Sequence, residues 1–272
     1  MTNSMPRRQF LAGSLAAAAA TGIGSASAAR PEPEKTAQEF YELRIYRNTD
    51  EKKKAIVENY LKGTLLPALG RLEISRIGVF SGLVIDDQAK QDASIYVLIP
   101  YRTLDVLAGL NSALAADAKY GKAAADFFAS PVKDPPYTRI ESRLMKAFAG
   151  IPVIELSSAS KSKKKRMFEL RIYESHNDEK ARRKVEMFNV GEIELMRKVN
   201  LSPVFFGETL ISDDVPNLTY MLSASDLESH KQHFQTFLAH PEWERMKKIE
   251  KFKGTVSKIT SVMLAPTKYS QI

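Results

Sequence analysis

Two six-residue stretches of this sequence place an acid, a guanidinium and a phenol at alternate positions. The first, Tyr41–Tyr46, reads YELRIY, and the second, Phe168–Tyr173, reads FELRIY, 127 positions further along the chain. Side chains alternate between the two faces of a strand, so the three polar residues of each copy share one face. Because a guanidinium can pair bidentately with a carboxylate, this face could bind an organic acid or a carbonyl compound. The candidate ligand-binding residues are therefore Glu42, Arg44, Tyr46, Glu169, Arg171 and Tyr173.

The opposite face of each stretch is apolar and carries a Leu and an Ile, such as Leu43 and Ile45 in the first copy. We expect this apolar face to pack on helices and the polar face to look into an interior shared by the two copies. The alternative is that Glu and Arg form internal ion pairs that fix how the copies associate, because buried charges need partners.

Histidines are the other residues whose spacing suggests chemistry. His230 and His233 are three positions apart on a predicted helix and face the same way, so they could share a metal or offer an axial ligand to haem. No acidic ligand is clearly placed beside them, and the H-E-x-x-H zinc motif is absent. We predict no metal and no cofactor, with these two histidines as the candidates if one is bound.

Several other chemistries find no support in the sequence. The chain contains no Cys, which excludes thiol catalysis and thiolate metal sites. It contains no G-x-S-x-G nucleophile motif, and it has no Gly-rich phosphate loop of the kind that nucleotide-binding α/β folds use.

The polar stretches begin two copies of one pattern, in which hydrophobic periodicity predicts the order strand, helix, strand, strand, helix, strand. The first copy is predicted as a strand at 41–46, a helix at 55–72, strands at 74–85 and 93–101, a helix at 104–128 and a strand at 137–150. The second is predicted as a strand at 168–173, a helix at 178–199, strands at 202–212 and 217–225, a helix at 227–252 and a strand at 255–266. This order is typical of an α+β, ferredoxin-like unit.

Individual residues indicate where the predicted helices begin or are interrupted. We expect Pro67 to kink or interrupt the first helix, and Asp178 to cap the corresponding helix of the second copy. Asp117 and His240 are expected to cap fresh helical turns, and Pro241 suits the first position of the second of these. Trp243 is expected to be a core anchor, with stacking on a substrate as the alternative.

The N-terminal residues 1–28 are typical of an export signal. Arg7 and Arg8 form a basic start, an Ala-rich apolar run follows, and Ala26-Ser27-Ala28 gives an A-x-A cleavage pattern. The paired arginines resemble the twin-arginine signal, so we expect contact with that export machinery, cleavage near Ala28 and a periplasmic or secreted protein. The apolar run is too weak for a stable membrane span, and residues 29–38 are expected to be a disordered mature N-terminus.

Most of the net charge of +8 lies in two short segments. Arg7 and Arg8 carry two of these charges and the run Lys161–Arg166 carries five, which leaves +1 for the rest. Such a run is usually solvated, so residues 151–166 are expected to link one domain at 39–150 to another at 167–272. No basic face remains, and we predict no nucleic-acid partner.

Both copies resemble the NIPSNAP family, through YELRIY, FELRIY, the FGETLI strand (Phe206–Ile211) and AHPEW (Ala239–Trp243). The resemblance implies a dimeric α/β-barrel, in which two ferredoxin-like units pair their sheets around a shared interior. With both units in one chain, the barrel could close within the chain or between copies of a homo-oligomer. One departure is that Ala118 and Tyr120 stand where the second copy has Pro241 and Trp243.

The family's activity is poorly defined, and relatives of the fold include cofactor-free monooxygenases, small isomerases and haem proteins. We expect first an exported module that binds a small organic ligand or a partner through a polar barrel cavity. The second expectation is a cofactor-free enzyme, monooxygenase- or isomerase-like, that uses the same cavity. The third is a haem- or metal-binding protein that uses the histidines. Fold alone does not decide among them.

Overall fold

A computed structural model describes residues 37–48, 50–83 and 93–272 of the chain. The expected export signal at 1–28, most of the segment 29–38 and the expected turn between the second and third strands lie outside these residues. We refer to residues 39–150 as the N-terminal half and to residues 167–272 as the C-terminal half.

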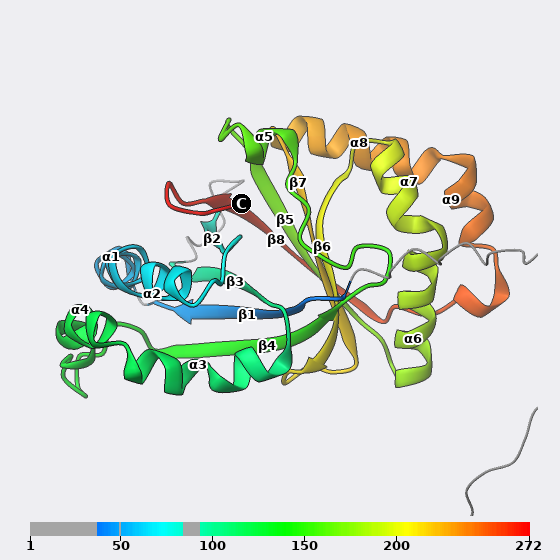
Figure 1. Cartoon of the computed structure of the whole chain (residues 1–272). Helices are drawn as coiled ribbons and strands as arrows, with labels where there is room; N and C mark the ends of the chain where they lie inside the picture. Colours follow the sequence, from blue (N-terminus) through cyan, green and yellow to red (C-terminus); the bar gives the residue numbers. More distant parts are fainter. Residues whose placement is uncertain (1–36, 49, 84–92) are drawn as a thin grey trace, which may run out of the picture. The chain divides into compact units, whose positions relative to one another are not determined.

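The two halves have their elements in the same order (Figure 1). The N-terminal half contains β1 (Phe40–Arg47), α1 (Glu51–Tyr60), the π-helical segment η1 (Leu61–Leu65), α2 (Leu66–Arg71), β2 (Gly78–Gly82), β3 (Ile95–Tyr101), α3 (Leu104–Ala116), α4 (Ala118–Phe128) and β4 (Arg139–Ala147). The C-terminal half contains β5 (Met167–Glu174), α6 (Asp178–Met187), the π-helical segment η2 (Phe188–Glu192), α7 (Ile193–Lys198), β6 (Ser202–Ile211), β7 (Asn217–Ala224), α8 (Leu227–Ala239), α9 (Pro241–Met246), the 3₁₀ turn η3 (Glu250–Phe252) and β8 (Lys258–Pro266).

The strands form one closed antiparallel barrel in the order β1-β3-β2-β8-β5-β7-β6-β4. Two seams join the halves: β2 pairs with β8, where Phe80 lies opposite Pro266, and β4 pairs with β6, where Met145 lies opposite Thr209. The fold is therefore mixed α/β with an eight-stranded barrel that closes within a single chain. Closure gives each strand a neighbour on both sides, although β4 meets β6 only from Leu144 onward and β8 meets β2 only from Leu264 onward.

Helix boundaries follow the capping signals with one exception. The Asp117 carboxylate accepts hydrogen bonds from the backbone N–H groups of Lys119 and Tyr120, and His240 Nδ1 accepts one from Glu242, so both predicted caps are confirmed. The prediction of Asp178 as a cap is wrong by one position. The Asn177 side chain accepts from the Lys180 N–H, and Asp178 is the first helical residue.

The first long helix of each half is interrupted by a π-helical segment at the same place, at Leu61–Leu65 and at Phe188–Glu192. The expected interruption is observed next to Pro67, which lies in the first turn of α2 directly after the first of these segments. Single π-helical turns occur frequently at functional sites, which draws attention to the residues that these two segments carry.

The centre of the barrel is apolar, with charged residues such as Glu141 and Arg143 toward one end, and the polar face of β1 lies outside it. Leu43 and Ile45 belong to one buried cluster with residues from all eight strands, whereas Tyr46 is buried among residues of α1, α2, α3 and α4. The expectation that Leu43 and Ile45 pack on helices while Glu42, Arg44 and Tyr46 look into the interior is therefore wrong. Strand alternation separates two faces but does not say which face is enclosed, and a small eight-stranded barrel is filled by side chains.

The linker between the halves is only partly solvated. Ile151 and Ile154 are buried, and the linker carries a short helix, α5 (Ser158–Lys161). At its end, Arg166 Nη2 donates a 2.7 Å hydrogen bond to the backbone oxygen of Ile272. The basic run thus contributes contacts to the barrel end. Across 37–48, 50–83 and 93–272, the helices are too short or too polar to cross a membrane.

Packing inside the barrel should dominate stability. Phe205 is fully buried there and meets the Tyr41 ring edge-on, with ring centroids 5.2 Å apart. We expect Phe205→Ala to lower the free energy of unfolding by about 3–5 kcal/mol, as measured by urea denaturation. The control Phe128→Ala removes a ring that is 61% exposed, and we expect about 1 kcal/mol or less. Equal losses in the two variants would contradict the assignment of the interior.

Candidate functional site

A cavity of about 720 Å³ lies in the C-terminal half, between its helices and the outward face of its sheet. We call it the C-terminal cavity. Strands β5 and β8 form its floor, and α6, η2, α7, α8, α9 and η3 contribute its walls. It is lined by Arg171, Tyr173, Lys184, Met187, Glu192, Met196, Phe234, Phe237, Leu238, Trp243, Lys247, Phe252, Lys253, Gly254, Thr255, Val256 and Ile259.

Glu169, Arg171 and Tyr173 lie on the helix side of β5, where Glu169 binds Arg171 and Tyr173 pairs with the Tyr220 hydroxyl. Glu169 Oε1 accepts from Arg171 Nη1 at 2.7 Å and from Ser261 Oγ at 2.5 Å, and its Oε2 lies 2.6 Å from His230 Nε2. Burial raises the pKa of Glu169, but the hydrogen bond from His230 and the charge of Arg171 outweigh it and hold that pKa below its usual value. Glu169 is therefore a carboxylate that fixes Arg171 at the cavity floor.

A second ion pair in the wall was missed by the sequence analysis. Lys184 Nζ lies 2.7 Å from Glu192 Oε2, and both side chains are at most 5% exposed. The ammonium also lies 4.4 Å from the centroid of the Phe188 ring and 5.6 Å from that of Trp243, as in a cation–π cluster. Burial raises the pKa of the Glu192 carboxyl even though Lys184 opposes this shift.

One signal in the sequence could have revealed this pair. Lys184 and Glu192 occupy the positions, 127 residues on, that Val57 and Leu65 hold in the N-terminal half, and those two are core residues. A charge that replaces a core residue of the sister copy marks a departure from pure packing.

The remaining wall is aromatic and apolar. Phe237 and Trp243 lie with ring centroids 4.9 Å apart, and the Arg171 guanidinium lies 5.0 Å from the centroid of the Phe234 ring. Trp243 is partly buried: it packs against the core of the C-terminal half, as expected, and it also lines the cavity. The cavity thus combines apolar walls with a few fixed polar groups, which is the usual composition of a small-molecule site.

Aromatic rings occupy most of the corresponding space in the N-terminal half, where a smaller pocket of about 290 Å³ remains beside Tyr60 and Phe127. Tyr60 stacks on Phe127 with centroids 3.9 Å apart, and its hydroxyl lies 2.7 Å from that of Tyr120. Tyr137 meets Tyr46 edge-on at 5.6 Å. The two halves therefore share the same arrangement of strands and helices but differ in the side chains that occupy the space between them.

The six sequence-predicted residues do not meet in one place. Glu42, Arg44 and Tyr46 lie beneath the helices of the N-terminal half, where Glu42 binds both arms of Arg44 at 2.9 Å. Each triad contains the Glu–Arg ion pair that the alternative predicted, but the pair lies inside its own half and does not join the two. Of the six residues, Arg171 and Tyr173 line the C-terminal cavity.

The two candidate histidines, His230 and His233, lie in different surroundings. His230 is 3% exposed with its Nε2 beside Glu169, whereas His233 on the next turn is partly exposed. In the described part of the chain no three His, Cys, Asp or Glu side chains are placed to hold a metal ion.

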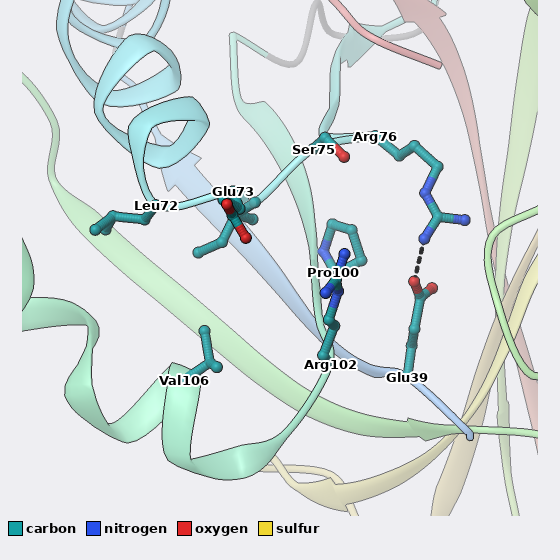
Figure 2. Close-up of a pocket in the computed structure, with 9 residues that line it drawn as sticks. Glu39, Leu72, Glu73, Ser75, Arg76, Pro100, Arg102 and Val106 are labelled. Atoms are coloured by element: carbon teal, nitrogen blue, oxygen red, sulfur yellow. Dashed lines mark hydrogen bonds and ion pairs between the residues drawn. The ribbon is translucent and has the colours of Figure 1, made fainter.

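Two further cavities carry paired charges. One of about 370 Å³ opens at a barrel end, where Arg47–Glu141 and Lys258–Glu174 are ion pairs at 2.7 and 2.8 Å. The other, of about 200 Å³, lies beside β1 and β3 (Figure 2).

In the second of these, Figure 2 shows the Arg76 side chain reaching Glu39. Arg76 also donates to the carbonyl of Ile154, whose N–H donates to Glu39 at 3.0 Å. These bonds tie the linker to the start of β1, so we read the small cavity as part of a structural clamp.

Part of the sequence matches a known family, and the fold resembles solved structures. Residues 168–271 match the sequence profile of the NIPSNAP family. A proposed monooxygenase from Lactobacillus acidophilus has a similar structure, with a TM-score of 0.53 and 10% identity over 84% of this chain and 94% of its own. A proposed monooxygenase from Fusobacterium nucleatum gives 0.50 and 9% over 86% and 94%.

A NIPSNAP-like domain protein from Burkholderia xenovorans is 22% identical over 39% of this chain and 88% of its own, with a TM-score of 0.36. None of the curated proteins matches the chain. At these identities the likeness to the two proposed monooxygenases establishes a shared fold and no more.

The buried Lys184–Glu192 pair should be dispensable for folding as a pair but not one residue at a time. We expect Lys184→Val to lower the free energy of unfolding by about 3–5 kcal/mol, because it leaves a buried carboxyl without its partner. The double variant Lys184→Val/Glu192→Leu, which carries the residues of the N-terminal half, should lie within about 1 kcal/mol of the wild type or above it.

The cost of Lys184→Val should also depend on pH. The folded-state pKa of Glu192 is raised, so the unfolded chain loses this proton first and stability falls as pH rises above the unfolded value of 4.5. Urea denaturation should therefore show that Lys184→Val lowers the free energy of unfolding more near pH 8 than near pH 5. A double variant as unstable as the single one would contradict this account.

Proposed function

We propose that this chain consists of two tandem NIPSNAP-type, ferredoxin-like repeats and that the second repeat binds a small, largely aromatic organic molecule in the C-terminal cavity. The contrast between the halves carries this proposal. In one half Tyr60, Tyr120, Phe127 and Tyr137 occupy most of the space between helices and sheet and leave about 290 Å³, whereas the other half is open over about 720 Å³. We further propose that the protein is exported, as residues 1–28 predict.

The shape and lining of the cavity support this function. Its volume falls in the range of about 300–1,000 Å³ that is usual for small-molecule sites. Flat rings such as Phe234 and Trp243 suit an aromatic ligand through stacked or edge-on contacts. The ligand site that we propose lies under the helices and not inside the barrel, where the sequence predicted it.

A second candidate is catalysis by acid and base without a cofactor, and Glu192 favours it. A buried carboxyl with a raised pKa beside an apolar cavity is a typical general base, because its proton affinity approaches that of its substrate. In this role Glu192 would take a proton from a hydroxylated aromatic ligand, and Lys184 would stabilise the charged carboxylate. The shared fold with two proposed monooxygenases is consistent with such an enzyme.

Binding can be followed through Trp243, because it is the single tryptophan of the chain and lines the cavity. We expect 6-nitro-2-naphthamide to quench its fluorescence saturably. Val256→Tyr places the ring of Tyr137 at the equivalent cavity position and should weaken binding at least about tenfold by filling the space. The control Val132→Tyr adds the same ring at a residue that is 96% exposed and should leave binding unchanged.

The catalytic candidate is tested by oxygen consumption with a panel of hydroxynaphthalenes and anthrones. If Glu192 is the general base, Glu192→Gln should lower turnover by about 10²–10⁴-fold while binding is kept. The control Lys198→Ala removes a surface partner of Glu242 and should keep full turnover. Equal turnover in wild type and Glu192→Gln would contradict the role of Glu192, and a panel without turnover would favour the binding function.

A further inference from the structure

Lys184 is buried, which is unusual for a lysine. Its side chain is 5% exposed, whereas those of Lys247 and Lys253, which also line the C-terminal cavity, are 44% and 56% exposed. Val57 holds the equivalent position in the core of the N-terminal half, so the fold itself does not require a charge there. Packing therefore does not explain why this position carries an amine.

The surroundings of the Lys184 amine suit a nucleophile. Its Nζ lies 2.7 Å from Glu192 Oε2. The ring centroids of Phe188 and Trp243 are 4.4 and 5.6 Å from the same nitrogen. Among the described residues, its other acceptor is the Met187 sulfur at 3.6 Å, which is a weak one. Lysines that react with carbonyl compounds are typically held in such apolar pockets, where the amine is poorly solvated.

Glu192 is placed to remove the proton that keeps this amine unreactive. An ammonium has no lone pair, so Lys184 must lose a proton before it attacks, and Glu192 Oε2 is the carboxylate oxygen beside it. Burial raises the pKa of the Glu192 carboxyl, which makes its carboxylate a stronger base than that of an exposed glutamate. Transfer of the proton gives a neutral amine and a neutral acid, which are easier to bury than two charges.

The cavity gives a carbonyl compound a place beside this amine. Lys184 and Glu192 both line the space of about 720 Å³. The rings of Phe234 and Trp243 belong to the same lining and suit a flat aromatic body. An aromatic aldehyde or ketone therefore matches the cavity in shape and polarity, and its carbonyl carbon matches the amine in reactivity.

We infer that Lys184 binds an aromatic aldehyde or ketone covalently, as an iminium, and that Glu192 carries the protons in this reaction. This inference rests on the proposed binding function and adds the class of ligand and the bond that holds it.

The reaction needs no further reagent. Glu192 takes a proton from the Lys184 ammonium, and the Nζ lone pair forms a bond to the carbonyl carbon. Through Glu192, the carbonyl oxygen receives two of the three ammonium protons in succession. It leaves as water when the C–O bond breaks and the nitrogen lone pair completes the C=N bond. The third proton stays on nitrogen, so the iminium keeps the positive charge and the N–H donor that Glu192 meets in the free protein.

The test treats the mature protein with 6-methoxy-2-naphthaldehyde and sodium cyanoborohydride, which reduces an iminium to a stable amine. We expect intact-protein mass spectrometry to show one methoxynaphthylmethyl group added saturably, and peptide mapping to place it on Lys184. Modification of Lys184 should be at least about tenfold faster than that of Lys247 or Lys253. The neutral 6-nitro-2-naphthamide, which forms no imine, should protect Lys184.

Two variants separate the roles of the pair. Lys184→Val/Glu192→Leu carries the side chains of the N-terminal half and should lose the saturable modification. Glu192→Gln keeps the amine but removes the proton carrier, so modification should be slowed about 10²-fold or more. The control Lys248→Arg removes an amine that is outside the cavity lining, on a side chain that is 74% exposed, and should leave the rate unchanged.

Quenching of Trp243 by the amide without modification of Lys184 would overturn this inference and leave the binding function intact. Absence of both quenching and modification would contradict the binding function itself. Modification of Lys184 at the rate of Lys247, or without protection by the amide, would also overturn the inference. An unchanged rate in Glu192→Gln would overturn the role of Glu192. If the double variant does not fold, peptide mapping and protection in the wild type decide.

Discussion

The closed barrel is the constraint on which the rest of this structure depends. Eight strands that close on themselves enclose one face of every strand, and the space inside is narrow enough to be filled by side chains such as Leu43 and Phe205. Polar groups on the other face must then lie beneath the helices. There they are largely shielded from water, and each needs a partner, which turns the helix–sheet layer into the place where chemistry is possible.

The need to satisfy buried charge explains both polar clusters of that layer. Glu169 is surrounded by Arg171, His230 and Ser261, and Lys184 faces Glu192. Such pairs contribute little to stability compared with apolar packing of equal volume, as the other half illustrates by placing apolar side chains where Lys184 and Glu192 stand. Their retention is more easily explained by use than by stability.

The shared element order allows the two halves to be compared within a single molecule. One half fills most of the helix–sheet layer with stacked rings, and Arg44 there binds both oxygens of Glu42. The other half keeps a larger space open, and Arg171 binds one oxygen of Glu169. The barrel requires both sheets, whereas the proposed binding function requires only one cavity.

The sequence by itself determined the order of elements, the caps at Asp117 and His240 and the residue types that share a strand face, because these depend on local periodicity and hydrogen bonding. Only the tertiary structure decided which face of β1 and β5 is enclosed, and that Lys184, Glu192 and His230 join the floor residues. Those facts depend on how the barrel closes and on contacts between residues far apart in sequence, which no local pattern encodes.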